Sequence, residues 1–193
     1  MNIQIFLAYL PYCLITTFTP GPNNLMSFYS VSNYGWRNGL KIISGIATGY
    51  IVGFSICAIL CNGLAIYIPE ITRWLKYVGV IYMLWLAVHI AISKPSNSNS
   101  AAVKFSSGFF LAITNVKVLL YFITIYTAYA IPAGADLIDL FIHGFATFIL
   151  AIISWTLWAC AGGLLQKFLT RHYRIFNIIM ALLLVWCAAS LIF

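Results

Sequence analysis

The sequence contains few charged residues, and acidic residues are the rarest of them. Asp and Glu number 3 and Lys and Arg number 10 among 193 residues, so 7% of the chain is charged, while 63% is hydrophobic. A soluble domain has about 25% charged residues. This composition excludes an ordinary soluble protein and indicates an integral membrane protein in a lipid bilayer. The net charge of +7 does not indicate a nucleic-acid partner, because no cluster of Lys and Arg alternates with aromatic residues.

Signatures of enzymes and pumps are also missing. The sequence has no Gly-x-x-x-x-Gly-Lys-Ser/Thr loop, so this chain does not itself hydrolyse ATP, which leaves an ATPase partner open. It has no His-Glu-x-x-His motif and no nucleophile set with histidine, so we expect no enzymatic activity, no cofactor and no metal. The cysteines lie inside apolar runs without a Cys-x-x-Cys pair, which favours small buried side chains; they are Cys13, Cys57, Cys61, Cys160 and Cys187.

Long hydrophobic runs divide the chain into six segments. They are Ile3–Tyr34, Ile42–Ile68, Trp74–Ile92, Phe105–Ile131, Leu137–Leu165 and Ile175–Phe193. A spanning helix needs about 20 residues, so six spans leave no room for a soluble domain of ordinary size. We therefore predict an all-α integral membrane protein with six transmembrane helices in a single domain, 1–193. The polar stretch 93–104 is the predicted cytoplasmic linker between the halves 1–92 and 105–193.

The basic residues predict the orientation of these spans. Seven of them follow the first, third and fifth segments, on one side of the bundle: Arg37, Lys41, Lys94, Lys104, Lys167, Arg171 and Arg174. The other side holds Arg73 and Lys76 with the three acidic residues, Glu70, Asp136 and Asp139. Because cytoplasmic loops collect Lys and Arg, both termini should face outward. Three spans in each half predict an inverted repeat, as in many secondary transporters. Five spans with one end inside is the alternative.

The first segment lacks the short apolar region and cleavage site of a signal peptide, so we expect it to be retained as a span rather than removed. It is too long for one straight span. A continuous helix from Ile3 to Tyr34 would be ~48 Å long, against ~30 Å for the hydrocarbon core. Within it lies the run Thr19-Pro20-Gly21-Pro22-Asn23-Asn24, whose prolines remove backbone donors. We predict that a helix stops here and a new one starts with Thr19 as N-cap, its positive dipole end facing a cavity that suits a carboxylate. A packing kink is the alternative.

The fourth segment contains a lysine at membrane depth. Lys117 lies ~18 Å along a helix from Phe105, near the bilayer midplane, where a charge is expensive and indicates a functional site. A lysine that only holds helices together is the alternative. Tyr121 shares the helix face of Lys117, whereas Asn115 would point elsewhere on an ideal helix. Lys117 and Asn115 can therefore line one cavity only if the helix is distorted between them.

Other polar or small residues give weaker signals. Gly45, Gly49 and Gly53 form a small-residue stripe, for which close helix packing is the favoured role. His89 and His143 could exchange protons near neutral pH, but a structural or interfacial role is favoured for each.

The motifs resemble those of the LysE/RhtB amino-acid exporter family over essentially the whole chain. The similar stretches are Thr19-Pro20-Gly21-Pro22-Asn23, Gly45-Ile46-Ala47-Thr48-Gly49, and Asn115-Val116-Lys117 with Leu120-Tyr121-Phe122. The run Asn177 to Cys187 is similar to the branch that exports cysteine and O-acetylserine. The resemblance implies efflux of a small amino acid across the bacterial inner membrane. It implies substrate-binding roles for the residues of the first and fourth segments: Pro20, Gly21, Pro22, Asn23, Asn24, Asn115, Lys117 and Tyr121.

Two departures from the family pattern bear on mechanism. Val116 stands where many relatives have proline, so the sequence leaves a second helix break near Asn115 open. Tyr50 stands where many relatives have an acidic residue, so proton coupling lacks its obvious carrier. If protons are the coupling ion, our hypothesis is that Lys117 carries them, releasing its proton when the site empties. The oligomeric state stays open, a homo-oligomer included. A thiol–disulfide electron carrier is the alternative function.

Overall fold

Apolar segments in lipid fold as helices, because each backbone polar group must then bond within its own segment. The computed structural model describes residues 3–63, 68–92 and 104–192, and its elements there are all helical. They are α1 (Ile3–Phe18), α2 (Pro22–Gly63), α3 (Ile68–Ile92), α4 (Phe105–Ile113), α5 (Val116–Thr124), α6 (Leu137–Leu164), α7 (Gln166–Arg171) and α8 (Tyr173–Ile192). A π-helical turn, Ile125–Ala130, and a 3₁₀ turn, Ile131–Ala133, follow α5. The all-α prediction is confirmed. The expected linker 93–104 lies outside the described residues except for Lys104.

The predicted boundary between the first two segments is present as a kink at Gly35, directly after Tyr34, although no loop lies there. Helix α2 runs through it and folds back on itself at Gly35, whose φ of 73° is a left-handed conformation that favours glycine. The two arms of α2 meet closely, since a Cβ on Gly39 would lie 2.7 Å from the Val31 side chain. The arms therefore cross the bundle in opposite directions.

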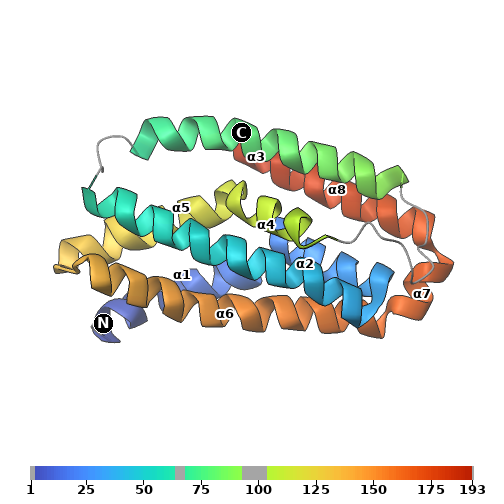
Figure 1. Ribbon diagram of the computed structural model, residues 1–193, viewed down its shortest axis with the longest axis horizontal. Helices are drawn as coiled ribbons and strands as arrows, with labels where there is room; N and C mark the ends of the chain where they lie inside the picture. The colour runs from blue at the N-terminus through green and yellow to red at the C-terminus, as the bar shows by residue number, and fades with distance from the viewer. Residues whose placement is uncertain (1–2, 64–67, 93–103, 193) are drawn as a thin grey trace.

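The helices lie roughly parallel or antiparallel along the long axis of the molecule (Figure 1). Helix α2 packs mainly against α6 and α4, and α3 packs mainly against α8. Glycines allow the closest of these approaches: a Cβ on Gly45 would overlap the Phe105 carbonyl oxygen, and one on Gly108 would overlap that of Ile42. The predicted packing role is thus confirmed for Gly45, whereas a Cβ on Gly53 would meet its nearest neighbour only at 4.0 Å.

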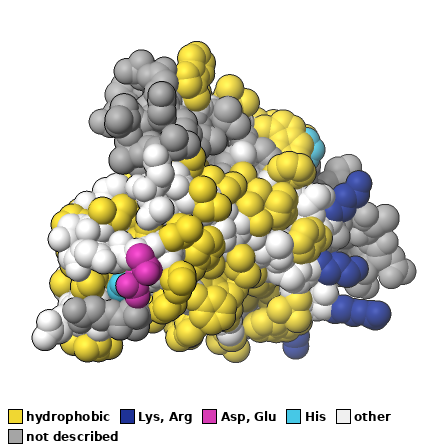
Figure 2. Space-filling view, turned by 60° about the vertical axis from the view of Figure 1, so that its left-hand side comes forward, with side chains coloured by type: hydrophobic (Ala, Val, Ile, Leu, Met, Phe, Trp, Pro, Cys, Tyr) yellow, Lys and Arg dark blue, Asp and Glu magenta, His cyan; other side chains and the backbone are white. Residues whose placement is uncertain are grey.

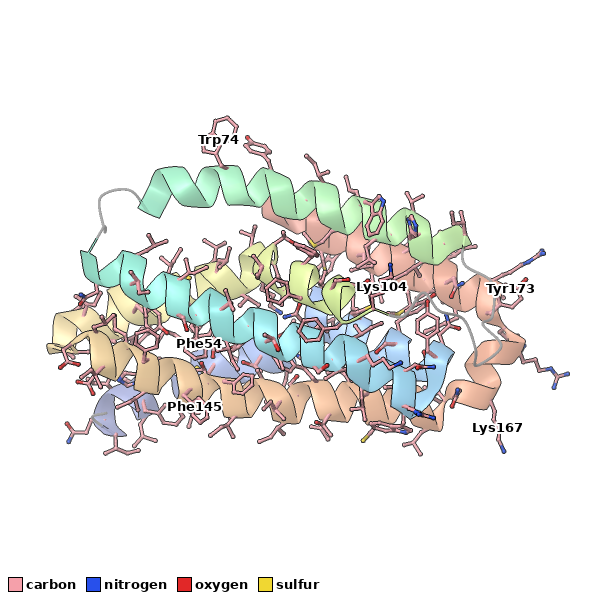
Figure 3. The ribbon with its side chains drawn as sticks, viewed as in Figure 1. Phe54, Trp74, Lys104, Phe145, Lys167 and Tyr173 are labelled. Atoms are coloured by element: carbon pink, nitrogen blue, oxygen red, sulfur yellow. The ribbon has the colours of Figure 1, made fainter. Side chains whose placement is uncertain are left out.

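In the part of the chain that the structure describes, three helical segments have the length and hydropathy to cross a membrane: Pro22–Gly63, Val116–Ala133 and Leu137–Leu164. Shorter apolar helices cover Ile3–Phe18, Met83–Ile92, Phe105–Thr114 and Tyr173–Ala189. Large apolar side chains project outward from the bundle, as Trp74 and Phe145 do, with 65% and 56% of their surfaces exposed (Figure 3). An apolar outer surface of this kind is expected where lipid is the solvent.

Charged side chains gather at the two ends of the bundle (Figure 2). Asp136 and Asp139 mark one end, where Asp136 caps α6 by accepting a hydrogen bond from the Asp139 amide at 2.8 Å. Lys167 lies at the opposite end, and Lys104 lies on the same side of the middle of the bundle (Figure 3). Asp136 and Asp139 are therefore separated from these two lysines along the long axis.

Candidate functional site

Two interrupted helices meet in the interior of the bundle. Helix α1 stops at Phe18 before α2 starts at Pro22, and α4 stops at Ile113 before α5 starts at Val116. The two helix starts are joined by a buried hydrogen bond of 3.1 Å, in which the Asn115 amide nitrogen donates to the Asn23 amide oxygen. The predicted break of the first segment is confirmed, and the second break, which the sequence left open, is present.

The capping of the first break differs from the prediction. The Thr19 hydroxyl donates to the Ile15 carbonyl and so belongs to the end of α1. The first backbone bond of α2 runs from the Leu25 amide to the Gly21 carbonyl at 2.8 Å, which makes Gly21 the N-cap and Pro22 the first helical residue. Proline suits that position, because the first-turn amide it lacks would have no helical partner. Thr19 as N-cap is therefore wrong by two residues.

The Asn24 side chain caps the C-terminal end of α1. Its side-chain nitrogen donates to the Thr17 carbonyl at 2.8 Å and to the Thr19 carbonyl at 3.0 Å. The Ser154 hydroxyl of α6 donates to the same Thr17 carbonyl at 2.9 Å. These bonds satisfy carbonyls that a helix end leaves without intrahelical partners. Asn24 thus has both of its donors committed to the backbone.

Asn115 explains how the second break forms without a proline. Its side-chain oxygen accepts a hydrogen bond from the Lys117 amide at 3.1 Å, which is the N-cap arrangement that starts a helix. Its side-chain nitrogen holds Asn23, as described above. One asparagine therefore starts α5 and ties it to α2, and Val116 needs no special backbone property.

Lys117 lies across the first break. Its ammonium donates to the Thr19 carbonyl at 3.3 Å, at the negative end of the α1 dipole. A Cβ on Gly21 would lie 3.0 Å from the Lys117 Nζ, so the absent side chain at Gly21 leaves the room that the lysine occupies. The distortion required for Asn115 and Lys117 to face one cavity is present as the break itself.

Two cavities adjoin at Asn115 and Lys117. The smaller, about 40 Å³, is lined by Thr16, Thr17, Gly21, Asn23, Asn24, Tyr50, Asn115, Lys117, Val118, Tyr121, Ala151 and Trp155. The larger, about 320 Å³, is lined by Tyr12, Thr16, Thr19, Pro20, Pro22, Met83, Asn115, Lys117, Leu120, Trp186 and Cys187. Room for a few waters is available in the smaller one. The larger has space for a small organic molecule.

The structure brings all eight predicted site residues to these cavities. Asn115 and Lys117 line both, and the other predicted residues line one or the other. Sequence reasoning missed the threonines of α1 and the aromatic residues of the wall: Thr16, Thr17, Tyr50 and Trp155. Tyr50 carried a signal, since the resemblance to the LysE/RhtB exporters implies an acidic residue at this position. Trp155 lies in the long, mostly apolar segment Leu137–Leu165 and carried none.

The polar groups at the smaller cavity suit an anion. Two helix N-termini, those of α2 and α5, meet here, and each presents a positive dipole end. The Asn23 side-chain nitrogen is buried and has no hydrogen-bond partner within the described ranges. Among the described residues, neither cavity is lined by Asp or Glu. A ligand carboxylate would accept from Asn23 and balance the charge of Lys117.

The histidines and cysteines have separate locations. His89 is exposed and stacks on Trp85, with ring centroids 4.3 Å apart, whereas His143 is fully buried against Tyr9. The five cysteines form no disulfide. Within the described ranges no three His, Cys, Asp or Glu side chains gather where they could hold a metal.

Known proteins are similar to this chain over its whole length or nearly so. The family description "LysE type translocator" matches residues 14–193. A cysteine/O-acetylserine efflux protein of Klebsiella pneumoniae is 34% identical over 194 residues, covering 100% of this chain and 99% of the relative. Proteins of the same name from Salmonella typhimurium and Escherichia coli K12 are 33% identical over 195 residues and 31% identical over 197, with 100% of both chains covered in each case. No solved structure matches the chain.

Proposed function

This chain belongs to the LysE type translocator family, and on that basis we propose that it exports cysteine and O-acetylserine. The family makes it an amino-acid exporter and a membrane protein, and the relatives named cysteine/O-acetylserine efflux proteins align with it over their full length or nearly so. The observation that carries the proposal is the unpartnered Asn23 donor beside Lys117, where two helix starts meet. Both substrates have an α-carboxylate that would fit these donors.

The substrate carboxylate binds between Asn23, Asn115 and Lys117 in this proposal. Helix N-termini favour anions, and a buried ammonium needs a negative partner. The Lys117 ammonium donates a hydrogen bond of 3.3 Å to the Thr19 carbonyl, and the substrate competes for the same ammonium. The substrate's own ammonium faces the aromatic wall of Tyr50, Tyr121 and Trp155, where ring faces attract cations. Pro20, Gly21, Pro22 and Asn24 hold the break open around it.

Six spans in two inverted halves form the proposed transport architecture. The interrupted helices recur at matching places: α1 and the first arm of α2 open the first half, and α4 and α5 open the second. Each half then continues with a long helix, the second arm of α2 or α6, and ends with a partner of the α3–α8 pair. Interrupted helices at corresponding positions are typical of inverted-repeat transporters with a central substrate site.

We place the protein in the bacterial inner membrane with both termini in the periplasm. The basic end carries exposed Arg37, Lys41, Lys104, Lys167, Arg171 and Arg174, and cytoplasmic ends collect such residues. Periplasmic and cytoplasmic reporters fused after Phe193 and inserted within 96–100 test this orientation. A C-terminal fusion active only in the cytoplasm would overturn it.

Transport of these substrates is testable with purified protein in liposomes. Vesicles loaded with unlabelled cysteine or O-acetylserine should take up the labelled compound by counterflow, and a panel of other amino acids should compete according to size. Protons are the proposed coupling ion, with Lys117 exchanging a proton as the site empties and fills. Absence of counterflow for every amino acid tested, with correctly folded protein, would refute the export function.

A further inference from the structure

A buried histidine lies outside the substrate site. His143 of α6 has no exposed surface, and its Nδ1 lies 2.7 Å from the hydroxyl of Tyr9 on α1, which is also fully buried. The other ring nitrogen, Nε2, is buried without a hydrogen-bond partner among the described residues. An unsatisfied ring nitrogen in an apolar interior costs about 1–3 kcal/mol. A purely structural histidine would be expected to use both nitrogens.

Polar side chains continue from this pair toward the substrate cavity. On α1, Cys13 follows Tyr9 by one turn and accepts a hydrogen bond of 2.9 Å from the Tyr121 hydroxyl. On α6, Thr147 follows His143 by one turn and is fully buried. The Tyr50 hydroxyl interacts with both Thr147 and Tyr121, and Tyr50 and Tyr121 line the smaller cavity. Hydroxyl, thiol and imidazole groups therefore form a column of side chains between His143 and the cavity.

The column also has an outer end. His143 lies six residues into α6, which is about 9 Å along the helix axis from the acidic end of the bundle. Asp139 lies one turn before His143 on the same face of α6 and interacts electrostatically with it. The distance along α6 from His143 to the cavity residue Ala151 is about 12 Å. His143 thus lies roughly midway between the acidic end and the cavity.

Among the described residues, the titratable groups around His143 and Tyr9 include no fully buried Asp, Glu, Lys or Arg. They are Asp139 of α6, Cys13 of α1, Tyr126 and Tyr129 of the π-helical turn, and Tyr50, Cys57 and Cys61 of α2. The Tyr126 hydroxyl approaches α6 at Gly144, next to His143, and is itself buried without a partner in the part of the chain that the structure describes. Imidazole is the group of this set that exchanges protons most readily near neutral pH.

We propose that the His143–Tyr9 pair is the proton-translocating site of this exporter and carries protons from the acidic end of the bundle to the substrate cavity. The inference rests on the proposed export function and deepens it. A proton arriving from the Asp139 side adds to one ring nitrogen of His143, and the imidazolium releases a proton from the other nitrogen. The proton released from Nδ1 passes to the Tyr9 hydroxyl, which gives up its own hydroxyl proton towards the cavity at Tyr50 and Tyr121 as substrate leaves. No bond other than O–H and N–H bonds is made or broken.

The test separates proton-driven transport from substrate exchange in liposomes containing the full chain. Counterflow at equal pH on both sides needs substrate binding and the conformational change, but no net proton movement. Uphill accumulation under an imposed pH gradient needs substrate binding, the conformational change and net proton movement. His143→Gln should therefore keep counterflow near the wild-type rate and lose gradient-driven accumulation by about 100-fold, the scale of a lost proton-transfer group. Tyr9→Phe keeps the ring packing and should reduce the same activity in the same direction.

Two variants serve as matched controls. His89→Gln makes the same chemical change at an exposed histidine, and Tyr129→Phe removes a hydroxyl from the ring that packs edge-on against Tyr9 at 5.9 Å. Both should accumulate substrate as the wild type does. Wild-type accumulation by both His143→Gln and Tyr9→Phe would overturn the proposal, as would an equal loss of counterflow and accumulation in both. A wild type that shows counterflow but ignores the pH gradient would overturn the proton site and leave the export function standing.

Discussion

Asn23 and Asn24 are adjacent asparagines with opposite expected roles. The Asn23 side-chain nitrogen is buried at the smaller cavity without a partner in the described ranges, whereas that of Asn24 donates to the Thr17 and Thr19 carbonyls. Replacing each with alanine should therefore separate substrate binding from stability. Asn23→Ala should weaken binding, and Asn24→Ala should mainly destabilise the fold.

The magnitudes follow from these hydrogen bonds. A hydrogen bond to a carboxylate contributes about 1.5–3 kcal/mol, so Asn23→Ala should raise the Kd for substrate by roughly 10- to 150-fold. Its effect on unfolding should be small, because the buried Asn115 side-chain nitrogen loses its acceptor, at a cost of about 1–3 kcal/mol, while the unsatisfied Asn23 donor disappears, which is a gain of similar size. Asn24→Ala loses two bonds to backbone carbonyls, which should lower the unfolding free energy by about 1–3 kcal/mol.

Binding of O-acetylserine to the detergent-purified protein and thermal unfolding of the same samples measure the two effects. The wild type and both variants are compared at one pH and salt concentration. Wild-type affinity in Asn23→Ala would refute the assignment of its free donor to the substrate. A large loss of thermal stability in that variant would instead indicate that Asn23 mainly holds the two helix starts together.

Three further changes test other parts of the structure. Gly108→Ala should lower the free energy of unfolding by about 1–3 kcal/mol because its Cβ overlaps the Ile42 carbonyl. Gly53→Ala, whose Cβ would meet Leu119 at 4.0 Å without a clash, should raise the free energy of unfolding by up to about 1 kcal/mol. Gly21→Ala should slow efflux in liposomes without unfolding the protein, because it displaces Lys117. Replacing all five cysteines, with serine at Cys13 to keep a partner for Tyr121, should leave efflux intact; its loss would favour thiol chemistry.

The helical fold and the location of the first break could be predicted because each has a local cause. Hydrophobic runs of spanning length fold as helices in lipid, and two prolines around Gly21 interrupt a helix wherever they occur. The exact cap could not be predicted in the same way. Thr19 is a good N-cap by residue type, but its hydroxyl bonds back to Ile15, and Gly21 takes the cap position instead.

The rest of the site depends on contacts between distant segments. Asn115 starts a helix without proline because its side chain also bonds Asn23, which is 92 residues away in the sequence. The wall residue Trp155 lies in an apolar run where no local pattern separates it from lipid-facing neighbours. His143 could be recognised as titratable, but its pairing with Tyr9 across 134 residues has no sequence signature.

Lys117→Met provides the most direct test of the central claim that the junction of the two interrupted helices binds the substrate carboxylate. The change keeps most of the side-chain volume and removes the ammonium that reaches across the first break to Thr19. Counterflow and efflux of cysteine and O-acetylserine in liposomes, normalised to the amount of folded protein, should both collapse, while Lys117→Arg should bind substrate but lose pH-dependent transport. Export by Lys117→Met at the wild-type rate would contradict the claim and leave Lys117 a structural residue.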